Sequence, residues 1–141
     1  MNELELLKQH HQEFLEMIDE VRLLINGETS KARADEAMEL ISRLNGQLMV
    51  HLTMEDRHVY PAMMISNNAE VRELATRFKS QIGGLFVAFQ AYRIKWSHSE
   101  QVVDDPVAFS ADTEEIFSIL NKRMALEDEI LYPKAPSLQI S

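Results

Sequence analysis

Polar and ionisable side chains recur at one level of four otherwise apolar stripes in this sequence. They are His11 in the first stripe, His51 and Glu55 in the second, Gln81 in the third, and Arg123 and Glu127 in the fourth. Burying ionisable groups is unfavourable unless they pair with one another or bind a metal. A cluster contributed by four segments therefore predicts either a metal site or a structural network of ion pairs.

His51 and Glu55 are the two residues that core packing explains least well. They lie four residues apart, so on a helix both side chains point the same way, within reach of one ion. Histidine and carboxylate ligands without a thiolate suit iron, manganese or zinc. For the other residues of the set, a purely structural role is the stronger interpretation. A lone His11 is typical of a hydrogen-bonded core histidine, and Arg123 with Glu127 is typical of an ion pair within a helix.

Two more histidines are weaker ligand candidates. His10 is the neighbour of His11 and would face inward if the helix were rotated slightly, so the sequence leaves open which of the two does. His58 follows Glu55 by about one turn, near a helix end, and is expected to face solvent.

Four helices are predicted to carry these residues, over about residues 2–26, 31–60, 69–97 and 111–132. In each range apolar residues recur at steps of three and four, which is the period of one helical face. Connections are short, so we expect an all-α, up-down-up-down four-helix bundle in a single domain spanning residues 1–141.

Breaker residues mark the expected helix ends. Gly27 is predicted to end the first helix and Pro61 the second. Ser30 and Ser110 are predicted N-caps of the second and fourth helices. Gly83 and Gly84 lie inside the third helix, where we expect them to allow close packing or a kink.

An internal repeat links the second and fourth helices. The segments MEDRHVYP (54–61) and LEDEILYP (126–133) share Glu-Asp, two variable residues, an aliphatic residue, Tyr and Pro, at a constant offset of 72 residues. Such fixed-offset similarity predicts a duplicated helical hairpin. The same register pairs His51 with Arg123.

The composition and motifs of the chain argue against several classes of function. A net charge of −9 argues against binding nucleic acid or anionic membranes. The chain has no cysteine, which excludes thiolate chemistry, and it begins without an apolar leader, so we expect a cytoplasmic protein. No phosphate loop or nucleophile elbow is present, and we therefore do not expect an enzyme. The expected partner is a metal ion, with a protein partner or a second copy of the chain left open.

The segment His51-Leu-Thr-Met-Glu55-Asp56, followed by Val-Tyr-Pro, resembles the HHE signature of hemerythrin-like proteins. His11 resembles the helix-one histidine of that family, and the segment from Leu126 to Pro133 resembles its fourth-helix ending. The resemblance covers nearly the whole chain. It implies a bundle that holds two irons bridged by carboxylates, for oxygen binding, storage or sensing.

The resemblance also implies which ligands are lost. The family carries two histidines in helix three, where this chain has Gln81 and Leu85, and a histidine one turn before the helix-four acid, where this chain has Arg123. It implies that one metal half-site remains, formed by His11, His51, Glu55 and Glu127.

Two hypotheses follow. The first is a bundle holding one iron, or one manganese or zinc ion. The second is a metal-free regulatory or interaction protein with a His–Glu–Arg–Gln core network. In either case we expect Arg123 to replace the second metal, held by Glu55 and Glu127, with the Gln81 amide completing the network.

Overall fold

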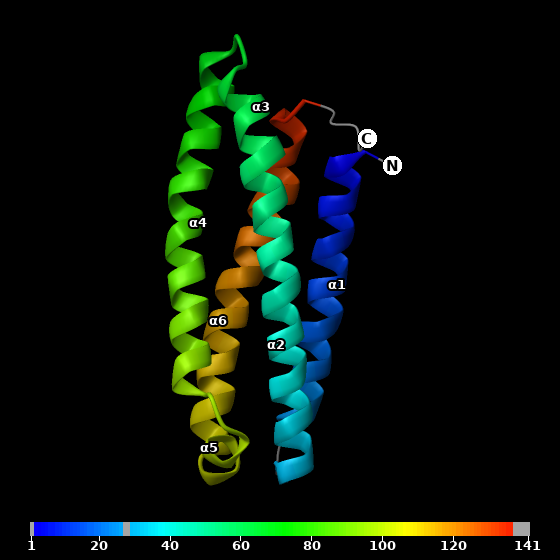
Figure 1. The fold of residues 1–141 in the computed structure, drawn as a ribbon, viewed down its shortest axis with the longest axis vertical. Helices are drawn as coiled ribbons and strands as arrows, with labels where there is room; N and C mark the ends of the chain where they lie inside the picture. Colours follow the sequence, from blue (N-terminus) through cyan, green and yellow to red (C-terminus); the bar gives the residue numbers. More distant parts are fainter. Residues whose placement is uncertain (1, 27–28, 137–141) are drawn as a thin grey trace.

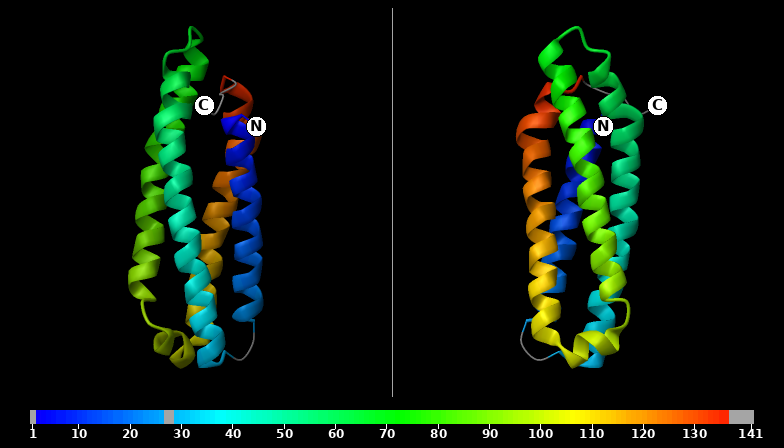
Figure 2. Two further views of the ribbon diagram at one scale, coloured as in Figure 1. Left: turned by 45° about the vertical axis from the view of Figure 1, so that its right-hand side comes forward. Right: turned by 90° about the vertical axis from the view of Figure 1, so that its left-hand side faces the viewer.

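Four long helices run alternately up and down in the computed structural model, which describes residues 2–26 and 29–136. They are α1 (Glu3–Leu24), α2 (Lys31–Met54), α4 (Ala69–Lys95) and α6 (Pro106–Leu126). Figures 1 and 2 show them side by side along the long axis, with the start of α1 and the last described residues at the same end of the bundle. The predicted all-α bundle is confirmed.

Both helices of the predicted repeat continue through a π turn. α2 passes through η1 (Glu55–Val59) into α3 (Tyr60–Met64), and α6 passes through η2 (Glu127–Leu131) into the 3₁₀ turn η3 (Tyr132–Lys134). The two π turns begin at equivalent positions of the repeat, 72 residues apart. π turns of this kind are frequent at functional sites, and both begin at a glutamate of the polar layer.

The helix starts follow from their capping residues. Ser30 accepts a hydrogen bond from the Arg33 backbone N–H, so the predicted cap of α2 is confirmed. The prediction that Ser110 caps the fourth helix is wrong. α6 begins earlier, at Pro106, because Asp105 accepts from the Ala108 backbone N–H and proline suits the first helical turn.

Two further predictions concerned the residues that end the first and second helices. The prediction for Pro61 is wrong, because Pro61 lies in the first turn of α3, directly after the π turn. Proline is tolerated in a first turn, where its missing N–H removes no necessary hydrogen bond. The predicted cap Gly27 lies outside the described residues. The linker before α6 contains a short helix that was not predicted, α5 (Ser99–Asp104).

The polar layer separates two apolar clusters of the core. The larger cluster includes Phe14, Leu48 and Leu120, and the smaller one includes Leu7 and Leu131. Each helix that carries a polar residue therefore passes from one cluster, through the layer, into the other. This arrangement holds the layer in a dry environment, where unpaired charges are strongly unfavourable.

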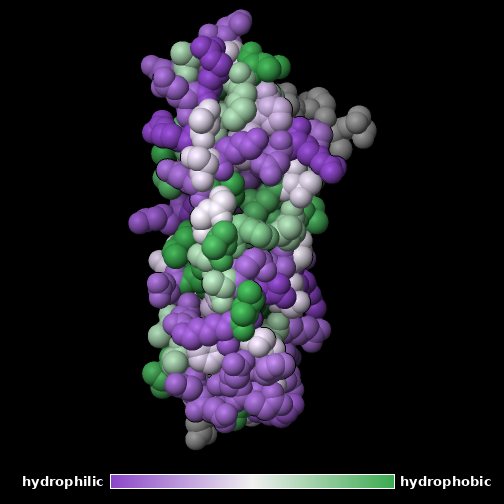
Figure 3. Space-filling view, turned by 60° about the vertical axis from the view of Figure 1, so that its left-hand side comes forward, coloured by the Kyte–Doolittle hydropathy of each residue, from purple (hydrophilic) through white to green (hydrophobic). Residues whose placement is uncertain are grey.

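The expectation that Gly83 and Gly84 allow close packing is wrong. Both glycines are exposed on α4, and a Cβ added at either would meet no atom within 4 Å. Figure 3 shows apolar side chains gathered near the middle of this side of the molecule, above a largely hydrophilic lower end. No helix among the described residues is long and apolar enough to cross a membrane.

Candidate metal centre

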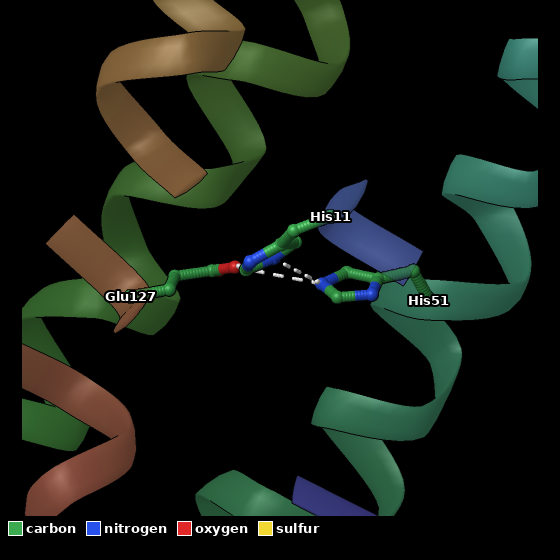
Figure 4. Close-up of side chains that lie close together, drawn as sticks. All are labelled: His11, His51 and Glu127. Carbon is green, nitrogen blue, oxygen red and sulfur yellow. Dashed lines mark hydrogen bonds and ion pairs between the residues drawn. The ribbon is translucent and has the colours of Figure 1, made fainter. Parts of the chain in front are cut away.

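Three buried donor atoms from three helical segments converge in the layer. His11 Nε2 on α1 lies 2.9 Å from Glu127 Oε1 on η2 and 3.2 Å from His51 Nε2 on α2. His51 Nε2 lies 3.4 Å from the same glutamate oxygen. All three side chains are at most 2% exposed, and Figure 4 shows them pointing toward one another. The structure thus brings together three of the four residues that the sequence assigned to one half-site.

The fourth residue of that set, Glu55, lies beside the three donors. Its Oε2 atom is 3.6 Å from His51 Nε2 and accepts a hydrogen bond of 2.9 Å from the Tyr132 hydroxyl. Its Oε1 atom is buried and has no hydrogen-bond partner among the described residues. Buried polar atoms are nearly always paired, so an orphaned carboxylate oxygen points to a missing cation or water.

Each inward histidine has its outer ring nitrogen occupied. His11 Nδ1 lies 3.0 Å from Asp128 Oδ1, and His51 Nδ1 lies 3.1 Å from His10 Nδ1. Burial and the neighbouring His51 lower the pKa of His10, so His10 is neutral and its ring nitrogen can accept. When an outer nitrogen donates in this way, the inner Nε2 keeps a lone pair for a metal, as in carboxylate–histidine–metal arrangements.

The open question about His10 and His11 is therefore resolved by position. His11 is the inward residue, whereas His10 is half-buried and contacts His51 from outside the cluster. His58 is 52% exposed and lies 3.6 Å from Glu3, away from the three donors. Its predicted solvent-facing position is confirmed.

Arg123 fills the other half of the layer, but its partners differ from those predicted. Its Nε donates to Glu127 Oε2 at 3.1 Å, and a terminal nitrogen donates to the Tyr60 hydroxyl at 2.9 Å and to the Phe78 carbonyl at 3.0 Å. The guanidinium also lies over the Phe78 ring, 4.6 Å from its centroid. The predicted contact with Glu55 is absent from the described interactions, because Glu55 turns toward Tyr132 instead.

The prediction that Gln81 completes the network is also wrong. Gln81 is exposed on α4. The inward residues at this level of the helix are Phe78 and the partly buried Ile82. Gln81 was assigned from spacing alone, which could not separate it from Ile82 one position further along the helix.

The repeat is visible in the contacts of the layer. Tyr60 and Tyr132 are equivalent residues, and so are His51 and Arg123. The Tyr60 hydroxyl bonds Arg123, and the Tyr132 hydroxyl lies 3.3 Å from His51 Nε2. Each tyrosine hydroxyl thus contacts a polar residue of the opposite hairpin: Tyr60 contacts Arg123, and Tyr132 contacts His51. Both tyrosines belong to the sequence repeat, but the repeat alone did not indicate that they lie in the site.

Protonation in the cluster is strongly biased by burial and charge. Burial lowers the pKa of His51, but hydrogen bonds to Glu127 and Glu55 outweigh it and raise that pKa to about 9. Burial and the Glu127 charge raise the pKa of Glu55 to about 7. Burial opposes ionisation of Glu127, yet hydrogen bonds from His11 and His51 hold its pKa well below the usual range. Without a metal, the two carboxylates therefore favour a proton on His51, beside the permanent charge of Arg123.

The chain matches the hemerythrin HHE cation-binding domain family over residues 2–135. It therefore belongs to this family, as the resemblance of its motifs implied. No curated protein and no solved structure matches the chain.

The residues present fit a metal of the kind that this family name describes. Two imidazoles and a carboxylate converge, their remaining ring nitrogens are occupied, and the orphaned oxygen of Glu55 lies alongside. Bonds of about 2.0 to 2.1 Å place neighbouring ligand atoms about 3 to 3.4 Å apart. The three measured separations fall in or close to that range.

Proposed function

We propose that this protein holds one divalent metal ion in the core of the bundle, through His11, His51 and Glu127. The observation that carries the proposal is the convergence of their three donor atoms, within 2.9–3.4 Å of one another, at a fully buried position. Glu55 lies beside these donors and supplies a second carboxylate, so Glu55 and Glu127 together match the charge of a divalent ion. Mixed imidazole and carboxylate donors favour iron, manganese or zinc.

A single ion agrees with the contacts of Arg123. The guanidinium occupies the other half of the layer and pairs with Glu127 Oε2, leaving Oε1 to face the two histidines. A permanent positive charge at this position disfavours a second metal. We therefore propose a mononuclear site, and storage or sensing of the ion rather than the two-iron oxygen chemistry that the family resemblance implies.

A redox-active ion such as iron would supply electron transfer and a coordination position for an oxygen-derived ligand. The chain's own residues supply the rest: Asp128 and His10 orient the imidazoles, and the apolar clusters on either side exclude bulk water.

The test is the metal content of protein purified without a metal-affinity tag and then offered Fe²⁺, Mn²⁺ or Zn²⁺. We expect about one ion per chain, and none in His51→Ala. His58→Ala is the matched control. It removes an exposed histidine from η1, which directly follows the helix that carries His51, and it should leave the metal content unchanged. Absence of metal from the folded wild-type protein under all three conditions contradicts the proposal and favours the metal-free network.

A further inference from the structure

The Tyr132 hydroxyl lies at a distance from the three proposed donors that matches their distances from one another. It is 3.2 Å from Glu127 Oε1, 3.3 Å from His51 Nε2 and 3.4 Å from His11 Nε2. Together with the three separations within the cluster, all six edges of this four-atom figure fall between 2.9 and 3.4 Å. The four atoms therefore form a nearly regular tetrahedron.

The size of this tetrahedron suits a metal ion. An ion at its centre, with bonds of about 2.0 to 2.1 Å, would separate its ligand atoms by about 3.3 Å. The hydroxyl thus stands at a vertex rather than filling the centre. Glu55 fits this vertex less well, since its Oε2 atom is 3.6 Å from His51 Nε2 and already accepts from Tyr132.

We infer that Tyr132 is the fourth ligand of the ion, bound as a phenolate, and that Glu55 takes the phenol proton. The inference rests on the proposed metal site. Binding of the ion would replace the O–H bond of Tyr132 with an oxygen–metal bond, and the proton would pass along the 2.9 Å hydrogen bond to the Oε2 atom of the Glu55 carboxylate. The charge of the protein groups is unchanged by this transfer, and a coordinated cation is what makes such an oxygen acidic.

The repeat supplies a matched control. Tyr60 occupies the equivalent position of the other hairpin, but its hydroxyl accepts a hydrogen bond from Arg123. A permanent cation already stands there, so Tyr60 has no metal to bind. Tyr60→Phe and Tyr132→Phe thus remove the same atom from equivalent positions directly after the two π turns, and only the second removes a proposed ligand.

The experiment is visible absorption spectroscopy of the protein loaded with one equivalent of Fe³⁺, with bound iron measured in parallel. A phenolate bound to ferric iron gives an intense charge-transfer band in the visible region. We expect this band in the wild type and in Tyr60→Phe. In Tyr132→Phe we expect it to disappear while iron remains bound through His11, His51 and Glu127.

The outcomes separate the inference from the proposed function. Iron-loaded wild type without the band, or a band unchanged in Tyr132→Phe, overturns the role of Tyr132 and leaves the metal site standing. Wild type that binds no iron, manganese or zinc overturns both. If Tyr132→Phe does not fold, resonance Raman spectra of the ferric wild type decide the matter: absence of enhanced phenolate ring modes overturns the inference.

Discussion

The inward histidine His11 is held by a residue that the sequence did not assign to the site, Asp128, whose carboxylate lies 3.0 Å from His11 Nδ1. Such outer partners fix the tautomer and the ring orientation and make the inner nitrogen a better ligand. The repeat contained the signal, because Asp56 and Asp128 are equivalent residues that both follow a glutamate of the layer.

Asp128→Asn is expected to lower metal affinity about 10- to 100-fold, the usual effect of removing an outer partner of a ligand histidine. Titration of the metal-free protein with Zn²⁺ against a competing chelator measures this change. Asp56→Asn is the control, because Asp56 is the exposed equivalent in the other hairpin. An equal loss of metal affinity in both variants would show that the loss comes from removing a negative charge and not from the contact between Asp128 and His11.

Arg123 stabilises the layer by pairing with Glu127 in a region where water cannot solvate either charge. Arg123→Ala removes the partner of a buried carboxylate and is expected to destabilise the metal-free protein by about 3–5 kcal/mol. Urea unfolding in the presence of a chelator gives the free energy.

Arg43→Ala serves as its comparison, because Arg43 is 58% exposed and lies 4.0 Å from Glu39. An exposed pair of this kind contributes at most about 0.5 kcal/mol. Similar small losses for both arginines would argue that Arg123 is not a structural replacement for a cation.

At the scale of elements, α6 shows how an N-cap decides where a helix begins. Asp105→Ala is expected to destabilise the protein by about 1 kcal/mol, because it leaves the Ala108 N–H without its acceptor. Ser110→Ala should have little effect, since Ser110 lies inside α6. Urea unfolding of the two variants measures the free energy of unfolding. A larger decrease for Ser110→Ala than for Asp105→Ala would support Ser110 as the N-cap, as predicted from the sequence.

The glycines of α4 add a second prediction at this scale. Gly84→Ala is expected to stabilise the protein by about 0.5–1 kcal/mol, because alanine has the better helix propensity and its Cβ meets no atom within 4 Å. Ala91→Gly, at an exposed position of the same helix, should give the opposite change. Thermal unfolding measures both. Destabilisation by Gly84→Ala would indicate that this side of α4 packs against a partner.

At the scale of the molecule, the proposed metal binding is coupled to folding, because the donor atoms come from three segments that only the folded bundle brings together. A ligand that binds only the folded state stabilises it by about 2.7 kcal/mol at a free concentration of 100 times Kd. We therefore expect the thermal midpoint to rise with Zn²⁺ or Fe²⁺ and to fall again with a chelator.

This stabilisation is expected to grow as the pH rises from 6 to 9. The pKa of His51 is raised from 6.5 to about 9, so its charged form stabilises the metal-free protein below pH 6.5 and that contribution is lost as the pH rises through 9. The raised pKa of Glu55, about 7, acts in the same direction from pH 4.5 upward. To bind the proposed ion, His51 must lose its proton and the Glu55–Tyr132 pair must carry a single proton, so the ion competes with fewer protons at higher pH.

Thermal midpoints at pH 6, 7, 8 and 9, with and without Zn²⁺, check this dependence. His51→Ala should show no midpoint rise with metal at any pH. A rise that shrinks between pH 6 and 8 would mean that the ion binds elsewhere than at the buried histidines.

The sequence by itself determined the helices, their order and the level of the polar layer. Apolar spacing of three and four residues marks a helical face, and a polar residue interrupting that face must be paired or bound, as His11, His51 and Glu127 are. These conclusions depend on local periodicity, which one sequence contains in full.

Only the tertiary structure decided the partners within the layer. A π turn adds one residue to a helical turn, which rotates everything beyond it by about 100° relative to the α-helical register. This is why Tyr132, which an uninterrupted α-helix would turn away from the face of Glu127, is buried and its hydroxyl enters the site. On α4, a difference of one position separated the exposed Gln81 from the inward Ile82. Such rotations come from packing between helices, so the pattern along a single helix could not contain them.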